Sequence, residues 1–274
     1  MSRTSVARRV AAQAVKVAAA GVDVVRRPTS GIVVLLYHRV GATTDSAVDL
    51  PVELFEQQMA EVSHRAMSLD SALEVLAGNA PPTERDIVVT FDDGTADFAD
   101  HALPILVQHR VPAVVYIATG FIEGQQNFPG DAAPLSWSAL RDAVGTELVT
   151  LGSHTDGHTL LDRVDEHTAA AELDRSIDLI GERLQLPVTH FAYPKAQAPN
   201  AVADREVRRR FRSAALAGTV ANVPGRTDPY RLSRSPIQVA DGMHWFRRKA
   251  AGGMAIEDGL RRFVNRGRYA GAVT

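Results

Sequence analysis

Ile87-Val88-Val89-Thr90-Phe91-Asp92-Asp93-Gly94 is the stretch that decides the fold, because a run of β-branched and aromatic residues leads directly into two adjacent carboxylates. Such a run favours a buried strand, whereas paired Asp side chains need a metal ion, a proton or a cationic partner when they are buried. A second polar cluster, His154-Thr155-Asp156-Gly157-His158, also follows an apolar run, at residues 148–151. Two imidazoles and a carboxylate are enough to hold one divalent ion.

The composition is that of a packed globular protein. The chain has 274 residues, of which 45% are hydrophobic and 23% are charged, enough apolar material for a full core. The length allows one large α/β domain or two small ones. The absence of cysteine excludes disulfides, thiolate zinc sites and cysteine nucleophiles, but leaves the cellular compartment open.

The two ends of the chain are basic, although the net charge is −2. Residues 1–27 carry six Lys and Arg against one Asp, and residues 244–274 carry seven against two acidic residues. Two interpretations stay open: solvated helix faces, or surfaces that contact anionic lipid or glycan. We expect no nucleic-acid partner and a monomer.

We divide the chain into three parts. Residues 1–30 are predicted to form a basic amphipathic helix, residues 31–240 a single catalytic domain, and residues 241–274 a basic helical tail. The apolar run at 17–22 is short for a signal peptide and far too short to span a bilayer. A cytoplasmic or peripheral membrane location is therefore favoured, with secretion as the alternative if residues 1–30 act as a weak signal peptide.

Strand-like and helix-like segments alternate about seven times along the catalytic domain. Strands are predicted at 32–37, 87–91, 113–118, 147–151, 191–194, 213–217 and near 236–239. Helices are predicted at 51–66, 71–77, 97–110 with an interruption near Pro104, 136–144, 166–185 and 201–211, and a loop at 120–134. This alternation indicates a parallel sheet with right-handed crossovers.

Polar residues follow at least four of the predicted strands: His38, Asp92-Asp93, His154 and Tyr193-Pro194. In a barrel every such loop opens on one face, whereas an open sheet has one switch point. No glycine-rich phosphate motif follows any strand, which counts against a nucleotide-binding sheet. We therefore predict a (β/α) barrel of seven or eight units in preference to an open sheet.

The residues of the two polar clusters suit a catalytic metal better than a structural one. Gly157 lies between the two histidines and no Glu follows His154, so the helical motif of zinc proteases fits poorly. One Asp with two His leaves open positions on the metal for water. The adjacent Asp side chains point in different directions at a strand end, so one can bind metal while the other acts as a base.

The motifs resemble those of the NodB-homology polysaccharide deacetylases, carbohydrate esterase family 4. Residues 90–94 are similar to the first motif of that family, residues 154–158 to the second, and Phe191-Ala192-Tyr193-Pro194 to one form of the third. Leu35-Leu36-Tyr37-His38-Arg39-Val40 resembles the opening of the subgroup active on poly-N-acetylglucosamine. The resemblance covers about residues 32–240 and implies a distorted (β/α) barrel with an Asp-His-His metal site.

The resemblance also implies roles for individual residues. Asp92 is expected to be the general base, and Asp93, His154 and His158 the ligands of a divalent ion, with Zn²⁺ as first choice and Co²⁺, Ni²⁺ or Mn²⁺ as alternatives. The backbone N–H of Tyr193 is expected in the oxyanion hole. Substrate contacts are expected from Phe191, Pro194 and Arg234.

The chain departs from the family at the general acid. Neither the late Leu-x-His motif nor the Asp-x-x-Asp-Trp motif follows Tyr193, and the third motif ends in Lys195-Ala196 instead of the commoner aromatic residue and glycine. We expect His38 to supply the acid, because it follows a predicted strand and imidazole titrates near neutrality. The alternatives are that His38 anchors its loop by a hydrogen bond, and that Arg39 or Arg234 orients Asp92.

Three functions stay open from the sequence. The first is metal-dependent hydrolysis of N-acetyl groups on an N-acetylhexosamine polysaccharide or glycan, a reaction at a non-peptide carbon–nitrogen bond. The second is O-deacetylation of a polysaccharide such as acetylated xylan. The third is a catalytically inactive glycan-binding barrel, which the intact set of base and ligands argues against.

Overall fold

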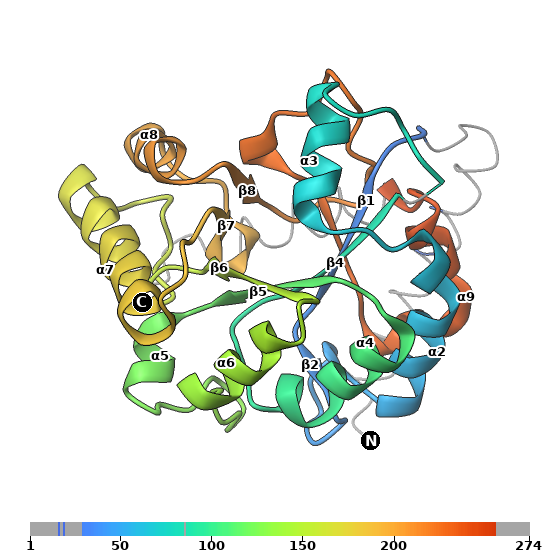
Figure 1. Cartoon of the computed structure of the whole chain (residues 1–274), viewed down its shortest axis with the longest axis horizontal. Helices are drawn as coiled ribbons and strands as arrows, with labels where there is room; N and C mark the ends of the chain where they lie inside the picture. Colours follow the sequence, from blue (N-terminus) through green and yellow to red (C-terminus); the bar gives the residue numbers. More distant parts are fainter. Residues whose placement is uncertain (1–15, 17–18, 20–28, 85, 256–274) are drawn as a thin grey trace, which may run out of the picture.

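Seven parallel strands form the centre of the molecule in the computed structural model, which describes residues 16, 19, 29–84 and 86–255 (Figure 1). The strands of this sheet are β1 (Val33–Tyr37), β4 (Ile87–Phe91), β5 (Ala113–Ile117), β6 (Val149–Ser153), β7 (His190–Ala192), β8 (Ser213–Ala215) and β9 (Arg234–Pro236). Their order is β8-β7-β6-β5-β4-β1-β9, so the first and last strands of the chain are neighbours. The sheet curls until its two edge strands, β8 and β9, approach each other, which gives the barrel that the sequence predicted.

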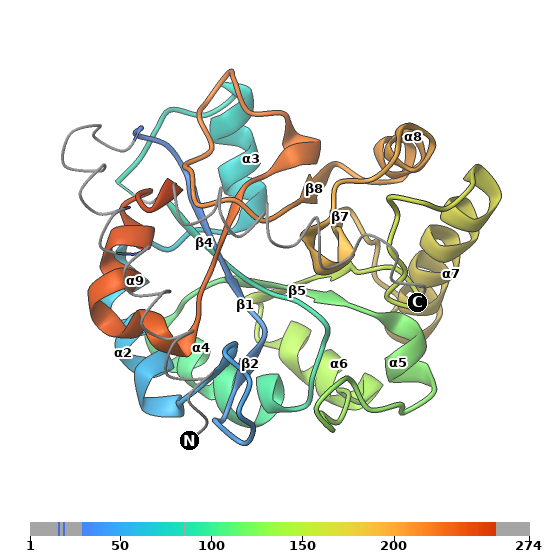
Figure 2. The ribbon, with the colours of Figure 1, turned by 180° about the vertical axis from the view of Figure 1, so that it is seen from behind.

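Backbone hydrogen bonds at the seam bring the two edge strands of this sheet together. Leu216 N–H donates to the Leu232 carbonyl and Gly218 N–H to the Arg234 carbonyl, each at 2.8 Å. These bonds join the end of β8 to the segment that leads into β9. The barrel is nearly closed at this seam (Figure 2).

Helices surround the barrel and connect its strands. They are α2 (Val52–Val62), α3 (Leu69–Ala77), α4 (Leu103–His109), α5 (Thr119–Glu123), α6 (Trp137–Gly145), α7 (Glu166–Leu184), α8 (Ala201–Arg210) and α9 (Gly242–Ala250). A π-helical turn at Phe98–Ala102 continues directly into α4, and Pro104 lies in the first turn of α4. The helix therefore changes type before Pro104, where an interruption was predicted. Two short strands, β2 (Arg39–Val40) and β3 (Asp49–Leu50), pair beside the barrel.

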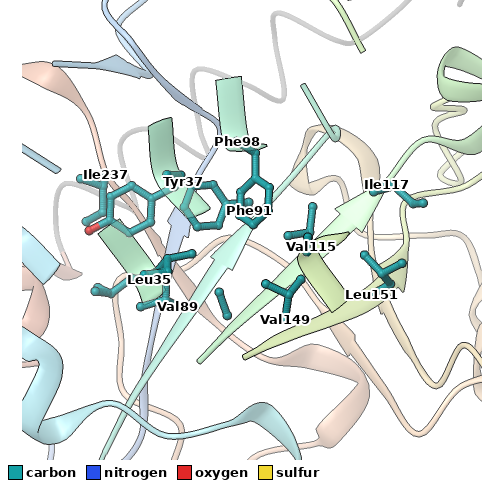
Figure 3. Close-up of a cluster of buried hydrophobic side chains, with 14 of the residues drawn as sticks. Leu35, Tyr37, Val89, Phe91, Phe98, Val115, Ile117, Val149, Leu151 and Ile237 are labelled. Atoms are coloured by element: carbon teal, nitrogen blue, oxygen red, sulfur yellow. The ribbon is translucent and has the colours of Figure 1, made fainter. Parts of the chain in front are cut away.

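The two faces of the strands build two separate cores. Outward residues such as Leu35, Val89 and Val115 pack under the surrounding helices, where Phe91 and Phe98 meet edge to face (Figure 3). Inward residues, among them Val34, Val88 and Tyr116, form a second cluster inside the barrel with the apolar side chains of α3. Helix α3 therefore closes the end where the strands begin, and the other end stays open for a site.

Several predicted boundaries need correction. The fourth strand is Val149–Ser153 instead of 147–151, the last is Arg234–Pro236 instead of 236–239, and the predicted loop at 120–134 begins within helix α5. Tertiary pairing decides these boundaries: β6 is paired with β5 through Ser153, so the strand continues past its apolar run.

Most of the predicted N-terminal helix, and residues 256–274 of the predicted tail, lie outside the described residues. Lys16 is described: it is 1% exposed and forms a buried ion pair with Asp241, to which Lys249 also binds. At least this one of the N-terminal basic residues therefore does not lie on a solvated face. Among the described residues, no helix is both long enough and apolar enough to cross a membrane.

Candidate active site

A cavity of about 960 Å³ opens at the ends of the strands opposite to α3. Its lining includes His38, Asp92, Asp93, His154 and His158, which lie far apart in the sequence. These residues follow β1, β4 and β6, so the parallel strands deliver them to one mouth of the barrel. The prediction that these five side chains share one site is consistent with this placement.

Asp92 continues the inward face of β4, two residues after Thr90. Its carboxylate is held by the Arg234 guanidinium through two hydrogen bonds, of 2.6 Å to Oδ1 and 2.8 Å to Oδ2. Arg234 is fully buried and Asp92 is 3% exposed, so each charge has the other as its partner away from water. Burial raises the pKa of Asp92, but the Arg234 guanidinium together with His154 and His38 outweighs this effect, so the pKa lies below its ordinary value.

Asp93 follows Asp92 with its backbone in the left-handed conformation, with φ of 73°. Its Oδ1 lies 3.3 Å from His158 Nε2 and 3.6 Å from His154 Nε2. Burial raises the pKa of Asp93, but the hydrogen bond from His158 and the neighbouring imidazoles hold the pKa well below the usual range. The two adjacent carboxylates therefore face different partners.

The donor atoms of Asp93, His154 and His158 fit one divalent ion. All three atoms lie within 4.8 Å of one another. Two ligands that are each about 2.1 Å from a tetrahedral ion are about 3.4 Å apart, close to the two separations measured here. One carboxylate oxygen with two imidazole nitrogens is a donor set that suits Zn²⁺ and its first-row neighbours.

The ring of His154 is fixed for metal binding by its second nitrogen. Nδ1 lies 2.7 Å from the carbonyl oxygen of Ala192, an acceptor, so Nδ1 carries the proton and Nε2 presents its lone pair to the cavity. Burial lowers the pKa of His154 to about 4, which keeps the imidazole neutral at physiological pH. A neutral imidazole is the form that binds metal.

Tyr116 fills the barrel below these groups, a feature that the sequence analysis missed. Its ring lies under the Arg234 guanidinium, 5.2 Å from ring centre to Cζ. A Cβ on Gly152 would come within 2.4 Å of this ring, so the glycine of β6 makes room for it. The signal was present in the sequence, since a glycine inside a strand often marks such a close approach.

Four predicted contacts need correction. The Tyr193 N–H donates to the Ala215 carbonyl at 3.1 Å within the barrel, so it is not available for an oxyanion hole. Phe191 is fully buried in the outer core, where it stacks on Phe211, and Pro194 is also buried, so neither side chain lines the cavity. Arg234 uses its guanidinium on Asp92 and the barrel backbone, so it orients the carboxylate instead of contacting substrate.

Lys195 follows Pro194 and is a second candidate for the donor that was predicted at Tyr193. It lies in the left-handed region, with φ of 54°, and it lines the cavity. In the described part of the chain, no backbone hydrogen bond outside the regular helices and strands uses its N–H. A backbone N–H at the cavity is the kind of donor that an oxyanion needs.

His38 lines the same cavity, on the side of β1. Its Nδ1 is buried and has no hydrogen-bond partner among the residues that the structure describes. The alternative that this nitrogen anchors the loop therefore finds no partner there. Its role as a general acid stays a prediction.

Comparison with known proteins gives a family for part of the chain. Residues 79–213 match the family model described as polysaccharide deacetylase. The poly-beta-1,6-N-acetyl-D-glucosamine N-deacetylase of Escherichia coli (strain K12) is 26% identical over 141 residues, which cover 47% of this chain. The chain spans about a fifth of the length of that relative, 21%.

Solved structures show the same fold. IcaB from Ammonifex degensii superposes with a TM-score of 0.71 at 23% identity, covering 81% of this chain and 98% of that chain. The deacetylase domain of BpsB from Bordetella bronchiseptica superposes with a TM-score of 0.63 at 20% identity, covering 77% of this chain and 98% of that chain. These likenesses establish the barrel architecture.

Proposed function

We propose that this chain removes N-acetyl groups from an N-acetylhexosamine polysaccharide or glycan by metal-dependent hydrolysis. Its residues 79–213 match the polysaccharide deacetylase family. The observation that supports the proposal most strongly is that one cavity holds both a metal-binding site and a separate ionised carboxylate. Asp93, His154 and His158 form a three-donor metal site, and Asp92, clamped by Arg234, lies beside it.

The three donors would hold a divalent ion through one oxygen and two nitrogens. Such an ion polarises an acetamide carbonyl and makes water a better nucleophile. Zn²⁺ is our first choice, with Co²⁺, Ni²⁺ and Mn²⁺ as alternatives, because the donor set does not separate them.

Asp92 is placed to act as the general base. Its carboxylate lies beside the metal site, with Oδ2 3.9 Å from His154 Nε2, and its pKa lies below the ordinary value, so it is ionised at neutral pH. It takes the proton of the attacking water as the new bond from oxygen to the acetyl carbon forms. Arg234 keeps the carboxylate in one orientation throughout.

The remaining steps need a donor for the oxyanion and an acid for the leaving nitrogen. The position of Lys195 in the cavity lining supports the first role for its N–H, since a backbone donor can stabilise the charge that develops on the carbonyl oxygen. His38 is our candidate for the second role: it delivers a proton to nitrogen as the carbon–nitrogen bond breaks. The products are acetate and a free amine on the sugar.

The substrate class rests on the similarity to the E. coli relative, whose name gives β-1,6-linked poly-N-acetylglucosamine as its substrate. We propose an N-acetylglucosamine polymer as the substrate of this chain as well. The cavity suits a polar sugar, because residues 44–46, Thr-Asp-Ser, line one wall and Gln238 also lines it.

The proposal is tested by measuring the acetate and the primary amine released from β-1,6-linked N-acetylglucosamine oligosaccharides. Acetylated xylan is the parallel substrate. We expect equal amounts of acetate and amine from the oligosaccharides, and neither product with an Asp92→Asn variant. Acetate from xylan without amine from the oligosaccharides would assign an O-deacetylase instead. Binding of the glycans without any acetate release would indicate an inactive barrel.

A further inference from the structure

The loop that carries His158 is held in a conformation that it would not adopt alone. Thr155 and His158 both lie in the left-handed region, with φ of 64° and 58°. Residues other than glycine adopt this region at a cost in free energy, and they keep it only where the surrounding structure enforces it. The contacts of residues 155–158 therefore decide where the His158 ring lies.

One side of this loop is held by the start of α5. Thr119 N–H donates to the Thr155 carbonyl at 3.3 Å, and Gly120 N–H donates to the Asp156 carbonyl at 2.9 Å. The Thr119 hydroxyl also donates to Asp156 Oδ1 at 2.7 Å. These bonds fix the carbonyl groups of the loop but leave its N–H groups without partners from α5.

The other side of the loop is held by one carboxylate of α7. Glu172 Oε2 accepts from the Asp156 N–H at 3.1 Å and from the Gly157 N–H at 2.8 Å. An ionised carboxylate that accepts two backbone N–H groups makes stronger hydrogen bonds than a neutral acceptor. These are the two peptide groups immediately before His158.

Helix α7 gives this carboxylate a rigid base. Asp165 caps its first turn by accepting from Thr168 N–H, and the flanking residues Ala169 and Leu173 are buried against the barrel. Gly157 fits the contact, because a Cβ there would lie 3.2 Å from Glu172 Oε1. The absence of a side chain at 157 lets the carboxylate approach the backbone.

We propose that Glu172 is a positioning residue, whose carboxylate holds loop 155–158 so that His158 stays within reach of Asp93 and His154 for a divalent cation. The inference rests on the proposed metal site. His154 has its own support, from β6 and from the Ala192 carbonyl. Loss of Glu172 should therefore disturb His158 and leave His154 in place.

The test measures Zn²⁺ affinity by calorimetry and the histidine ring resonances by NMR in Glu172→Ala and Glu172→Gln. Glu172→Ala should bind Zn²⁺ 10- to 100-fold more weakly, the usual effect of losing a group that supports a metal ligand. Its His158 resonances should change more than those of His154, whose ring lies 5.0 Å away between ring centres. Glu172→Gln keeps one acceptor oxygen and should recover most of the affinity. The control is Glu182→Ala, an exposed position on the same helix, which should bind as the parent does.

A double-mutant cycle with Gly157→Ala adds a second, independent readout. The added Cβ would lie 3.2 Å from Glu172 Oε1 and 3.3 Å from Thr159 Oγ1, so it should weaken Zn²⁺ binding more when Glu172 is present than in Glu172→Ala. Amide hydrogen exchange of Asp156 and Gly157 in the metal-free protein should be faster in Glu172→Ala. This exchange result separates the inference from the proposed function, since it needs neither metal nor turnover. Unchanged exchange and equal Zn²⁺ affinity in Glu172→Ala and the parent would overturn the proposal.

Discussion

Replacement of Arg234 by Met gives the sharpest view of how the barrel holds a reactive carboxylate. Arg234 is fully buried, and its guanidinium donates to both oxygens of Asp92, to the Thr90 hydroxyl at 3.3 Å and to the Leu216 carbonyl at 3.1 Å. Met fills a similar volume without donors. The Arg234→Met variant therefore leaves Asp92 as a buried charge without its cationic partner.

The expected effect has two parts. Breaking a buried ion pair by removing one partner costs about 3–5 kcal/mol of folding stability. Burial raises the pKa of Asp92, and the Arg234 charge is the largest opposing influence, so its removal should move this pKa upward. Each unit of that rise corresponds to about 1.4 kcal/mol. A base that must be ionised then loses activity at the acid end of the pH range.

The assay combines denaturant unfolding with the pH profile of kcat/KM for acetate release. We expect Arg234→Met to lose stability and to move the acid limb of the profile to higher pH, because Asp92 then lacks the cation that lowers its pKa. The matched control is Arg212→Met, because Arg212 is 53% exposed and its ion pair with Asp70 should contribute only about 0–1 kcal/mol. The double variant Arg234→Met with Asp92→Asn should regain most of the stability and stay inactive. A stability loss no larger than in the control, with an unmoved acid limb, would refute the reasoning.

Three further predictions concern single side chains. Asp92→Asn should keep its metal and lose about 10²–10⁴-fold in kcat, the usual contribution of a general base, whereas Asp93→Ala should lose metal first; metal analysis beside kinetics separates the two. His38→Ala should lower kcat at full metal occupancy and remove the alkaline limb of the pH profile, and wild-type rates with an unchanged profile would exclude it as the acid. Gly152→Ala should destabilise the fold by about 1–3 kcal/mol through crowding of Tyr116, as urea unfolding measures, and an unchanged midpoint would contradict the tight approach.

The strands of the barrel and the cluster of reactive residues could be predicted because each is encoded locally. β-Branched runs such as residues 87–89 favour a strand wherever they occur, and polar residues directly after several such runs reach one face in a parallel barrel. That rule predicts the shared location of Asp92, Asp93, His154 and His158. The motif resemblance then gave them roles.

The direction of side chains on these strands could not be predicted in the same way. In a parallel barrel both faces of a strand are buried, so the sequence lacks the alternation of polar and apolar residues that identifies a face. The motif resemblance placed Phe191 at the substrate, and no alternation in the sequence showed that it points into the outer core. The same resemblance assigned the Tyr193 N–H to the oxyanion hole, whereas its bond to Ala215 depends on the partner strand.

Arg234 illustrates a limit of another kind. A charged residue in a weak strand pattern is ordinarily placed at the surface, and the sequence gives no sign that it is fully buried. Its burial becomes reasonable only when β9 lies beside β1 and the guanidinium meets Asp92. The alternative that Arg234 orients Asp92 agrees with these contacts.

The most direct test of the catalytic metal site is to remove the metal with a chelator and then add back one equivalent per chain. Protein treated with a chelator should keep its circular dichroism spectrum and its unfolding midpoint within a few degrees, because the barrel has a core of its own. It should lose acetate release from N-acetylglucosamine oligosaccharides, and one equivalent of Zn²⁺ or Co²⁺ per chain should restore that activity. Full activity in the chelated protein would contradict the assignment of Asp93, His154 and His158 as a catalytic metal site. Unfolding of the chelated protein, with activity returning only when metal refolds it, would contradict the assignment as well.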